Sequence, residues 1–399
     1  MLQLAQRMSR AKPSAIMVIA DKAKRLKAEG RDIISFSIGV PNFLPGEHVY
    51  AAVREALTHD SGQYGSNRGA DALLDAFLAH MQALGLTGYT RKNCSTGIGA
   101  KHVLYNLFEA LLNEGDTIAF PTPYWTSYLD IAEIVGANVL TLPCRAEQNY
   151  KLTPAQLDAA LASKPKVFLF NNPSNPTGMV YSRDEIAALA DVLVRYPETW
   201  IISDDIYNTM VFDGLGYTNF LHCRPELRDR VIFVDSLSKT YGMPGWRVGF
   251  MAGPEAVANA VTTLNSNHIT NIPEMTTAAA IAALSGPQDV PAQRCAEFQQ
   301  KRDQVVAALT AIPGVVCPKP QGAFYVFPDI SCGFGKSHNG VLIADDVALC
   351  AALLEAKGVA CVPGSAFGEP NALRISYTCP TPQLAPGLER IQAFFAELQ

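Results

Sequence analysis

One stretch, from Val231 to Phe250, constrains the fold of this 399-residue chain more than any other. It opens with the apolar, β-branched run Val231–Val234, which predicts a buried strand, and a second short strand is predicted from Val248 onward. Lys239 lies between the two strands and is poorly explained as a solvated surface charge. An amine held near apolar walls and other cations can lose its proton near neutral pH, which is the state that forms a Schiff base.

The polar side chains around Lys239 suit a phosphate group. Ser236 and Ser238 supply two hydroxyls, and Arg247 supplies a planar guanidinium that can bind two phosphate oxygens at once. A polar turn at a strand end, with incidental basic residues, is the plainer interpretation, and these residues alone leave it open.

The motif Ser-Leu-Ser-Lys at residues 236–239, with Arg247 eight residues later in Gly-Trp-Arg-Val-Gly, resembles the cofactor-lysine segment of class I aminotransferases. These are pyridoxal-phosphate enzymes with the aspartate aminotransferase fold, and the chain is most similar to the bacterial aspartate/prephenate branch. The resemblance implies that Lys239 is the catalytic lysine that binds the cofactor covalently. It also implies that Ser236, Ser238 and Arg247 hold the cofactor phosphate.

Two further segments follow buried strands and resemble the same family. In residues 171–178, Asn-Asn-Pro-Ser-Asn-Pro-Thr-Gly, two prolines stiffen a loop, and the resemblance implies that Asn175 binds the cofactor ring oxygen and the substrate carboxylate. Asp204 directly follows a strand, where an unpaired carboxylate would be costly. The resemblance implies that Asp204 keeps the ring nitrogen protonated and that Tyr207 binds the ring oxygen. A helix-capping aspartate is the alternative interpretation of Asp204.

A glycine-rich turn, Ser95–Lys101, leads into a helix predicted from His102 to Leu112. The free N–H groups and the positive dipole at such a helix start favour an anion. The turn lacks the third glycine of a dinucleotide-binding fingerprint. We therefore expect the backbone groups of Gly99, Ala100 and Lys101 to bind the same phosphate as the serines.

Two aromatic residues complete the predicted cofactor site. Trp125 follows the short strand Thr117–Phe120, where an aromatic side chain can stack on a flat ring, and the resemblance assigns it that role. The resemblance also implies that Tyr64 reaches the phosphate of the neighbouring subunit, which predicts a homodimer with shared active sites. A packed tryptophan and a surface-turn tyrosine are the plainer alternatives.

A strand predicted over residues 372–377 places Arg374 on the face opposite its apolar neighbours. The resemblance makes Arg374 the residue that binds the substrate α-carboxylate with both guanidinium prongs. Lys101 and Lys12 match lysines that meet a distal carboxylate and a ring-acid substrate. The full predicted substrate site is Gly39, Trp125, Asn175, Arg374 and Lys12.

Three positions depart from the aspartate/prephenate pattern. Ile16 replaces the usual threonine, and Val40 and Asn42 replace the two acids of a Gly-Glu-Pro-Asp loop. An aromatic or broad amino-acid specificity therefore stays open, and so does a pyridoxal-phosphate lyase on the same fold.

Composition narrows the class of protein. A net charge of −5 and the lack of a basic stripe argue against nucleic-acid binding, and no apolar run approaches the roughly 18 residues that span a bilayer. The N-terminus has no long apolar stretch of a secretory signal. The nine cysteines form no C-x-x-C pair, which predicts free thiols in a cytoplasmic protein, and no metal-binding motif occurs.

Alternating strands, loops and helices over residues 90–250 predict an α/β fold with a mostly parallel sheet. The resemblance implies fold type I of the pyridoxal-phosphate-dependent transferases. We expect a large cofactor-binding domain at residues 46–286 and a smaller α+β domain from residues 1–45 and 287–399. The predicted function is transfer of an amino group from an L-amino acid, with aspartate or another acidic amino acid favoured, to a 2-oxo acid.

Overall fold

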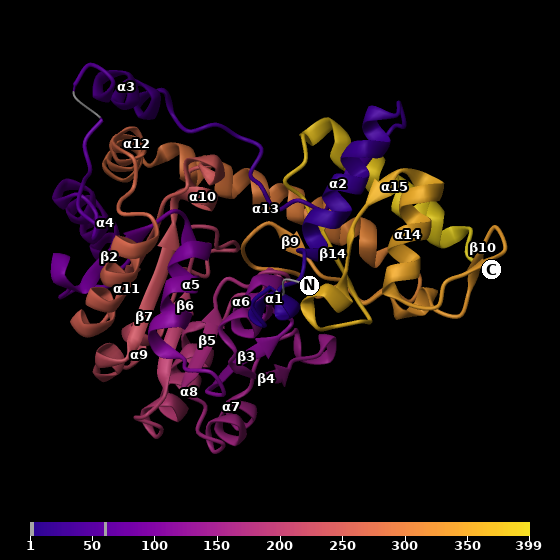
Figure 1. Ribbon diagram of the computed structural model, residues 1–399. Coiled ribbons are helices and arrows are strands. Elements are labelled where there is room, and N and C mark those ends of the chain that lie inside the picture. The colour runs from indigo at the N-terminus through magenta and orange to yellow at the C-terminus, as the bar shows by residue number, and fades with distance from the viewer. Residues whose placement is uncertain (1–3, 60–61) are drawn as a thin grey trace.

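The computed structural model describes residues 4–59 and 62–399. Its largest sheet has seven strands in the order β2-β8-β7-β6-β5-β3-β4 (Figure 1). In this sheet β8 is antiparallel to both of its neighbours, β2 and β7, and all other adjacent strands are parallel. The predicted mostly parallel sheet is therefore confirmed. The strands are β2 (Cys94–Gly97), β3 (Thr117–Thr122), β4 (Asn138–Pro143), β5 (Val167–Asn171), β6 (Trp200–Asp204), β7 (Val231–Ser236) and β8 (Gly249–Ala252).

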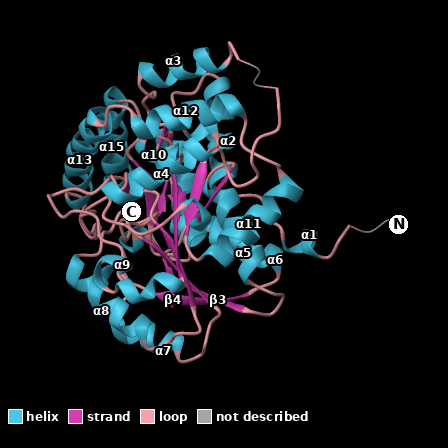
Figure 2. Ribbon diagram, turned by 90° about the vertical axis from the view of Figure 1, so that its left-hand side faces the viewer, coloured by secondary structure: helices cyan, strands magenta, loops and turns pink. Residues whose placement is uncertain are grey.

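Side chains that alternate along the strands pack into different cores, and helices cover both faces of the sheet (Figure 2). In β5, Val167 and Leu169 join the core beneath α5, whereas Phe168 and Phe170 join the core beneath α7 and α8. Burying such a side chain contributes about 1.5–3 kcal/mol, which fixes the register of the strand. The helices are α5 (Ala100–Leu111), α6 (Thr126–Val135), α7 (Pro154–Leu161), α8 (Arg183–Val194), α9 (Phe220–Cys223) and α11 (Glu255–His268).

A third apolar core lies at the end of the sheet formed by β2, β8 and β7. Phe77 stacks on Phe250 with 4.5 Å between ring centroids, and Phe233 packs beside them. The helices of this region are α3 (Glu47–Ala56), α4 (Asp71–Ala83) and α12 (Glu274–Ser285), and α10 (Leu237–Thr240) begins directly after β7.

Segments from both ends of the sequence lie together in a second, smaller body (Figure 1). The strand β1 (Ile34–Ser35) is only two residues long and pairs in parallel with β12 (Val359–Ala360). Beside it lies the antiparallel sheet β13-β14-β9, made of β13 (Val362–Pro363), β14 (Leu373–Ser376) and β9 (Tyr325–Val326). A small hairpin joins β10 (Ser337–His338) and β11 (Val341–Leu342).

The helices of this second body come from both ends of the chain. They are α2 (Ala15–Ala28), α13 (Asp289–Thr310), α14 (Asp346–Lys357) and α15 (Thr381–Ala396), while α1 (Arg7–Arg10) packs on α6. Short 3-10 turns are η1 (Arg91–Asn93), η2 (Ala146–Gln148), η3 (Pro225–Asp229), η4 (Pro244–Trp246), η5 (Ser331–Gly333) and η6 (Gly364–Phe367). The domain division at residues 46 and 286 stays a prediction. No described helix combines the length and the apolar character needed to cross a membrane.

Gly249 lets β8 approach the start of α5 closely. A Cβ atom at this position would lie 2.4 Å from the backbone nitrogen of Ala100, and backbone cannot move aside cheaply. We expect Gly249→Ala to lower the free energy of unfolding by about 1–3 kcal/mol, measured by urea unfolding of the cofactor-free protein. Gly245→Ala is the control, because no atom lies within 4 Å of its Cβ position, and equal midpoints for the two variants would contradict the packing argument.

Candidate active site

A cavity of about 370 Å³ opens where the carboxyl ends of the parallel strands meet the second body. Loops that follow parallel strands converge at one sheet edge, which is where ligands bind in such sheets. The cavity therefore joins residues from both ends of the chain. The predicted site residues that line it are Gly39, Ala100, Lys101, Trp125, Asn175, Asp204, Tyr207, Ser236, Ser238, Lys239, Arg247 and Arg374.

Three predicted site residues do not line the cavity. Gly99 lies just behind its wall, since a Cβ there would be 2.4 Å from the Arg247 guanidinium. Tyr64 is 88% exposed and lies outside the cavity of its own chain. Lys12 pairs with Glu133, with 3.0 Å between Nζ and Oε2. The roles predicted for these three residues, like those of the residues that line the cavity, stay predictions.

Lys239 lies on the short helix α10, which begins where β7 ends, so its side chain enters the cavity. Its Nζ donates to the Gly39 carbonyl at 2.7 Å and lies 5.6 Å from the centroid of the Phe324 ring. Burial lowers the pKa of Lys239 to about 7, and the nearby Arg374 adds to the effect. The environment of Lys239 therefore favours the uncharged amine, which is the form that the sequence interpretation requires.

Asp204 ends β6 and is fully buried. Its Oδ2 accepts a hydrogen bond of 2.5 Å from the Tyr128 hydroxyl, whereas Oδ1 has no hydrogen-bond partner among the described residues. Burial raises the pKa of Asp204 to about 6, and the Tyr128 hydrogen bond opposes that rise. A buried carboxylate oxygen left without a donor is costly, and a protonated ring nitrogen would satisfy it.

The phosphate end of the site is built around the start of α5. Gly99 has a φ of 93°, a conformation that favours glycine, and its N–H donates to the Gly97 carbonyl at 2.8 Å. The N–H groups of Ala100 and Lys101 lie in the first helical turn, where no preceding carbonyl of the helix can accept them. These two N–H groups suit an anion better than that of Gly99.

Arg247 and the two serines line the same cavity as this helix start, and the Arg247 guanidinium lies against Gly99. Ser236 caps α10, with its hydroxyl accepting from the Ser238 N–H at 3.3 Å. The Arg247 Nη1 donates to the Pro244 carbonyl at 2.9 Å, which orients the guanidinium. Two hydroxyls, a guanidinium and free N–H groups together match the oxygens of a phosphate.

Aromatic side chains, among them Trp125, Tyr128, Tyr207 and Tyr325, line the cavity. The Trp125 ring packs edge-on against Tyr128 at 5.5 Å, and the Lys101 Nζ lies 5.0 Å from its centroid. Tyr207 is buried and its hydroxyl lies 2.9 Å from the Tyr325 hydroxyl. A flat ring would contact Trp125 on one side and find polar side chains at its edge.

Arg374 is fully buried on β14 and its guanidinium is fixed on several sides. Nη1 donates to the Asn175 Oδ1 at 3.0 Å and Nη2 donates to the Ser37 carbonyl at 2.6 Å. The rings of Tyr325 and Phe367 lie 4.7 and 4.8 Å from Cζ. Burial lowers the pKa of Arg374, so an incoming carboxylate would offset the cost of a buried cation.

The sequence interpretation missed three residues of the site. Tyr128 supports Asp204, and Asn171 donates to the Asp204 carbonyl at 2.7 Å and accepts from the Asn175 N–H at 2.8 Å. Tyr325 lines the cavity beside Arg374. Tyr128 lies one helical turn beyond Trp125, so helical spacing could have found it, whereas no local signal marks Tyr325.

The residues present fit the pyridoxal phosphate implied by the sequence resemblance. The observation that decides this is the partnerless Oδ1 of Asp204, because it needs a donor such as the protonated ring nitrogen. The helix start of α5, the two serines and Arg247 would hold the phosphate, and Lys239 is the amine available to the aldehyde. The described residues include no group of three His, Cys, Asp or Glu side chains that could hold a metal ion.

Comparison with known proteins gives five consistent matches: a family model, two relatives and two solved structures. Residues 31–391 match the family model described as aminotransferase class I and II. The aspartate/prephenate aminotransferase of Cereibacter sphaeroides is 41% identical over 396 residues, 99% of each chain, and the aspartate aminotransferase of Geobacillus stearothermophilus is 36% identical over 98% of this chain and 99% of its own. The crystal structure of the Rhizobium meliloti aspartate aminotransferase gives a TM-score of 0.96 at 36% identity, with both chains fully covered. The Thermus thermophilus aspartate aminotransferase with maleate gives 0.90 at 29% identity, covering 99% of this chain and all of its own.

The lowered pKa of Lys239 predicts a pH dependence for cofactor incorporation. Bond formation to the aldehyde needs the uncharged amine, which becomes dominant as pH rises through about 7 here, against about 10.4 for an ordinary lysine. We therefore expect the rate at which the cofactor-free protein forms its bond to pyridoxal phosphate to rise with pH and to level off above about pH 8. Stopped-flow absorbance between pH 5 and 9 measures this rate. A rate that still climbs tenfold per pH unit at pH 9 would contradict the argument.

Proposed function

The chain belongs to the class I and II aminotransferases, and we propose that it moves the amino group of L-aspartate, in preference to other amino acids, to a 2-oxo acid. Its fold is fold type I, as predicted, and pyridoxal phosphate is its cofactor. Amino transfer itself follows from the family, so the proposal concerns the amino donor, the roles of the individual residues and the assembly of the site.

One observation carries the proposal: a lysine with a lowered pKa and a buried arginine open into the same cavity. The Arg374 prongs would bind the substrate α-carboxylate in a bidentate way and so aim the α-carbon at Lys239. When bound, pyridoxal phosphate supplies the electron sink that stabilises the carbanion at that α-carbon. Lys239 would then take the proton from the α-carbon and return it to the adjoining cofactor carbon.

The remaining residues tune and hold the cofactor in this proposal. Asp204 keeps the ring nitrogen protonated, because its carboxylate has no other donor at Oδ1. Tyr207 and Asn175 donate to the ring oxygen, and Trp125 holds the ring plane. A hydrogen bond to a charged group contributes about 1.5–3 kcal/mol, so the loss of Asp204 should slow turnover far more than it harms folding.

Two features support aspartate as the donor, and a third favours its competitors. Lys101 lines the cavity opposite the sheet edge and can meet a second carboxylate. The relatives from Cereibacter and Geobacillus carry aspartate in their names, and the former also carries prephenate. Ile16 and Val40, two of the departures from the family pattern, also lie in the cavity wall, so apolar donors are the direct competitors of aspartate.

An absorption spectrum tests the donor. We expect L-aspartate, added to the cofactor-loaded protein without any 2-oxo acid, to remove the visible band and to convert the cofactor to its amine form. Arg374→Lys keeps the charge but loses the two-pronged geometry, so its rate with aspartate should fall about 10- to 150-fold.

The outcomes separate the alternatives. A visible band that aspartate leaves unchanged but L-phenylalanine removes would replace aspartate with an aromatic or broad donor. Release of ammonia or carbon dioxide with no amine form of the cofactor would indicate a lyase. No visible band after addition of pyridoxal phosphate would mean that Lys239 is wrongly assigned.

We propose a homodimer in which Tyr64 of each subunit binds the cofactor phosphate of the other. The 88% exposure of Tyr64 supports this, since a single chain leaves the ring uncovered. We expect Tyr64→Phe to weaken cofactor binding roughly tenfold, because one hydrogen bond to a charged phosphate is lost.

Mixing of variant subunits tests whether each active site contains residues from both subunits. A hybrid of Tyr64→Phe and Lys239→Ala subunits contains one site with both native residues, so the mixture should regain activity that neither parent has at limiting cofactor. A mixture no more active than the average of its parents would contradict shared sites.

The domain division and the location of the protein complete the proposal. We propose that residues 46–286 form one domain and that residues 1–45 and 287–399 form the other. The pairing of β1 with β12 supports the second unit, because it joins both ends of the chain. A cytoplasmic location is supported by nine free cysteines, all of them buried or partly buried thiols.

A further inference from the structure

Arg302 is a fully buried arginine that lies outside the cavity. It projects from α13, the long helix that runs between the two bodies (Figure 1). A buried guanidinium is stable only when its donors are paired, so its partners show what it holds in place.

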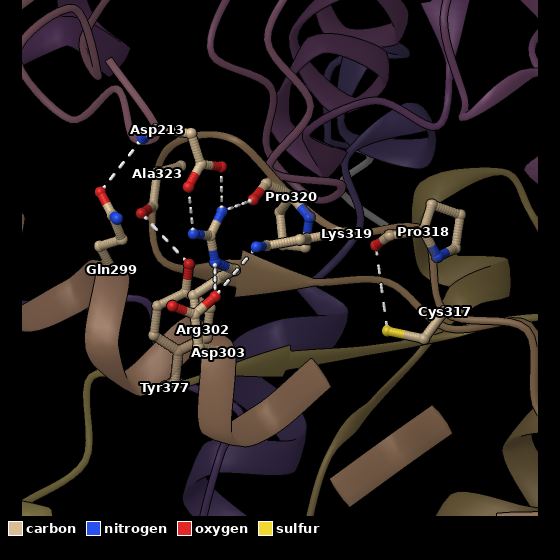
Figure 3. A network of polar contacts seen from close by, with 10 residues as sticks. All are labelled: Asp213, Gln299, Arg302, Asp303, Cys317, Pro318, Lys319, Pro320, Ala323 and Tyr377. Carbon is tan, nitrogen blue, oxygen red and sulfur yellow. Dashed lines mark hydrogen bonds and ion pairs between the residues drawn. The ribbon is translucent and has the colours of Figure 1, made fainter. Parts of the chain in front are cut away.

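Nε of Arg302 pairs with Asp303, the next residue on α13, at 2.8 Å, and the other partners of Arg302 lie in two segments far apart in the sequence (Figure 3). Nη1 donates to the Asp213 Oδ2 at 2.8 Å and to the Pro320 carbonyl at 2.6 Å, and Nη2 donates to the Asp213 Oδ1 at 2.7 Å. These hydrogen bonds from Arg302 hold the pKa of Asp213 below its usual range. One guanidinium thus clamps the segment that ends at Asp213 to the segment that begins at Pro320.

A second contact from α13 reinforces the clamp. Gln299, one helical turn before Arg302, accepts at its Oε1 from the Asp213 N–H at 3.1 Å (Figure 3). Asp213 has a φ of 59°, a conformation that few residues other than glycine adopt. The two contacts from α13 offset the strain of that backbone.

The two clamped segments also pair through their backbones. The Phe212 N–H donates to the Gln321 carbonyl at 2.7 Å, and the Ala323 N–H donates to the Met210 carbonyl at 2.9 Å. Ala323 has a φ of 54°, and the Tyr377 hydroxyl donates to its carbonyl at 3.4 Å. The path of residues 320–323 is therefore set by contacts to α13, to residues 210–213 and to Tyr377, which directly follows β14.

This segment continues directly into the active site. Phe324 lies 5.6 Å from the Lys239 amine, and Tyr325 packs its ring 4.7 Å from the Arg374 Cζ. Tyr325 is only 1% exposed, and a Cβ atom on Gly39 would lie 2.1 Å from its hydroxyl. Because the side chains around Tyr325 are closely packed, a displacement of the backbone at Pro320 would also displace the Tyr325 ring.

We propose that Arg302, through Asp213 and Pro320, is a positioning residue for the carboxylate-binding arginine: it fixes the segment from Pro320 to Tyr325 and thereby holds the Tyr325 ring against the Arg374 guanidinium. The inference rests on the proposed role of Arg374 in binding the substrate carboxylate. Arg302 touches neither substrate nor cofactor, and its effect on ligand binding passes through Tyr325.

The test measures maleate binding to the cofactor-loaded protein by calorimetry, because this dicarboxylate reports on the carboxylate site without turnover. We expect Arg302→Met to weaken maleate binding about tenfold, within the range of coupled residues, and Arg302→Lys to weaken it less. Val305→Ala is the matched control, since Val305 is fully buried on the same helix but joins the apolar core instead of the clamp. It should lower the melting temperature and leave maleate binding within about twofold, the range of uncoupled sites.

A double variant separates positioning from general loss of structure. In a Tyr325→Ala background, Arg302→Met should weaken maleate binding by less than about twofold further, because the ring it positions is already gone. Effects that multiply in the double variant, or an Arg302→Met affinity equal to that of Val305→Ala, would overturn the proposal. Should Arg302→Met not fold, Arg302→Lys and Asp213→Asn carry the same comparison.

The experiments distinguish an error in the role of Arg302 from an error in the proposed amino donor. A wild-type protein that rejects aspartate contradicts the donor, and the same variants are then compared with an amino acid that the protein accepts. The coupling between Arg302 and Tyr325 decides the inference in either case.

Discussion

The active site depends on three ionisable side chains that are buried at one edge of the large sheet. Asp204, Arg374 and the Lys239 amine all face one cavity, and each has its pKa shifted toward the uncharged form by burial. Ion pairs alone do not resolve that cost, because Oδ1 of Asp204 has no donor and Nε of Arg374 has no acceptor among the described residues. The fold tolerates the imbalance because a cofactor and a substrate carry the opposite charges.

Support for these groups comes from uncharged neighbours. Tyr128 donates to Asp204, Tyr325 and Phe367 pack on the two sides of Arg374, and the Gly39 carbonyl accepts from Lys239. Hydroxyls, rings and carbonyls orient a charge without neutralising it, so the charge stays available for the ligand. The clamp at Arg302 is the contrasting case, because its guanidinium is paired with a carboxylate and serves the backbone.

Sequence reasoning predicted the sheet and twelve residues of the cavity wall, because most of those residues follow an apolar strand in a recognisable local motif. Asp204 after β6 and Lys239 after β7 are examples. It did not predict Tyr325 or Arg302, whose importance comes from contacts with distant segments. Nor did it predict the pairing of β1 with β12, because the two partners lie at opposite ends of the chain.

The hydrogen bond from Arg374 to the Ser37 carbonyl spans 337 residues of sequence, and the pairing of β1 with β12 spans nearly as many. A ribosome adds about 5–20 residues per second, so the N-terminal wall of the cavity waits roughly 20–70 s for its partner. Residues 46–286 have left the ribosome by then and can fold around the sheet. The growing chain can thus bury its sheet before the proposed carboxylate site exists. That site forms only when β14, which carries Arg374, leaves the ribosome.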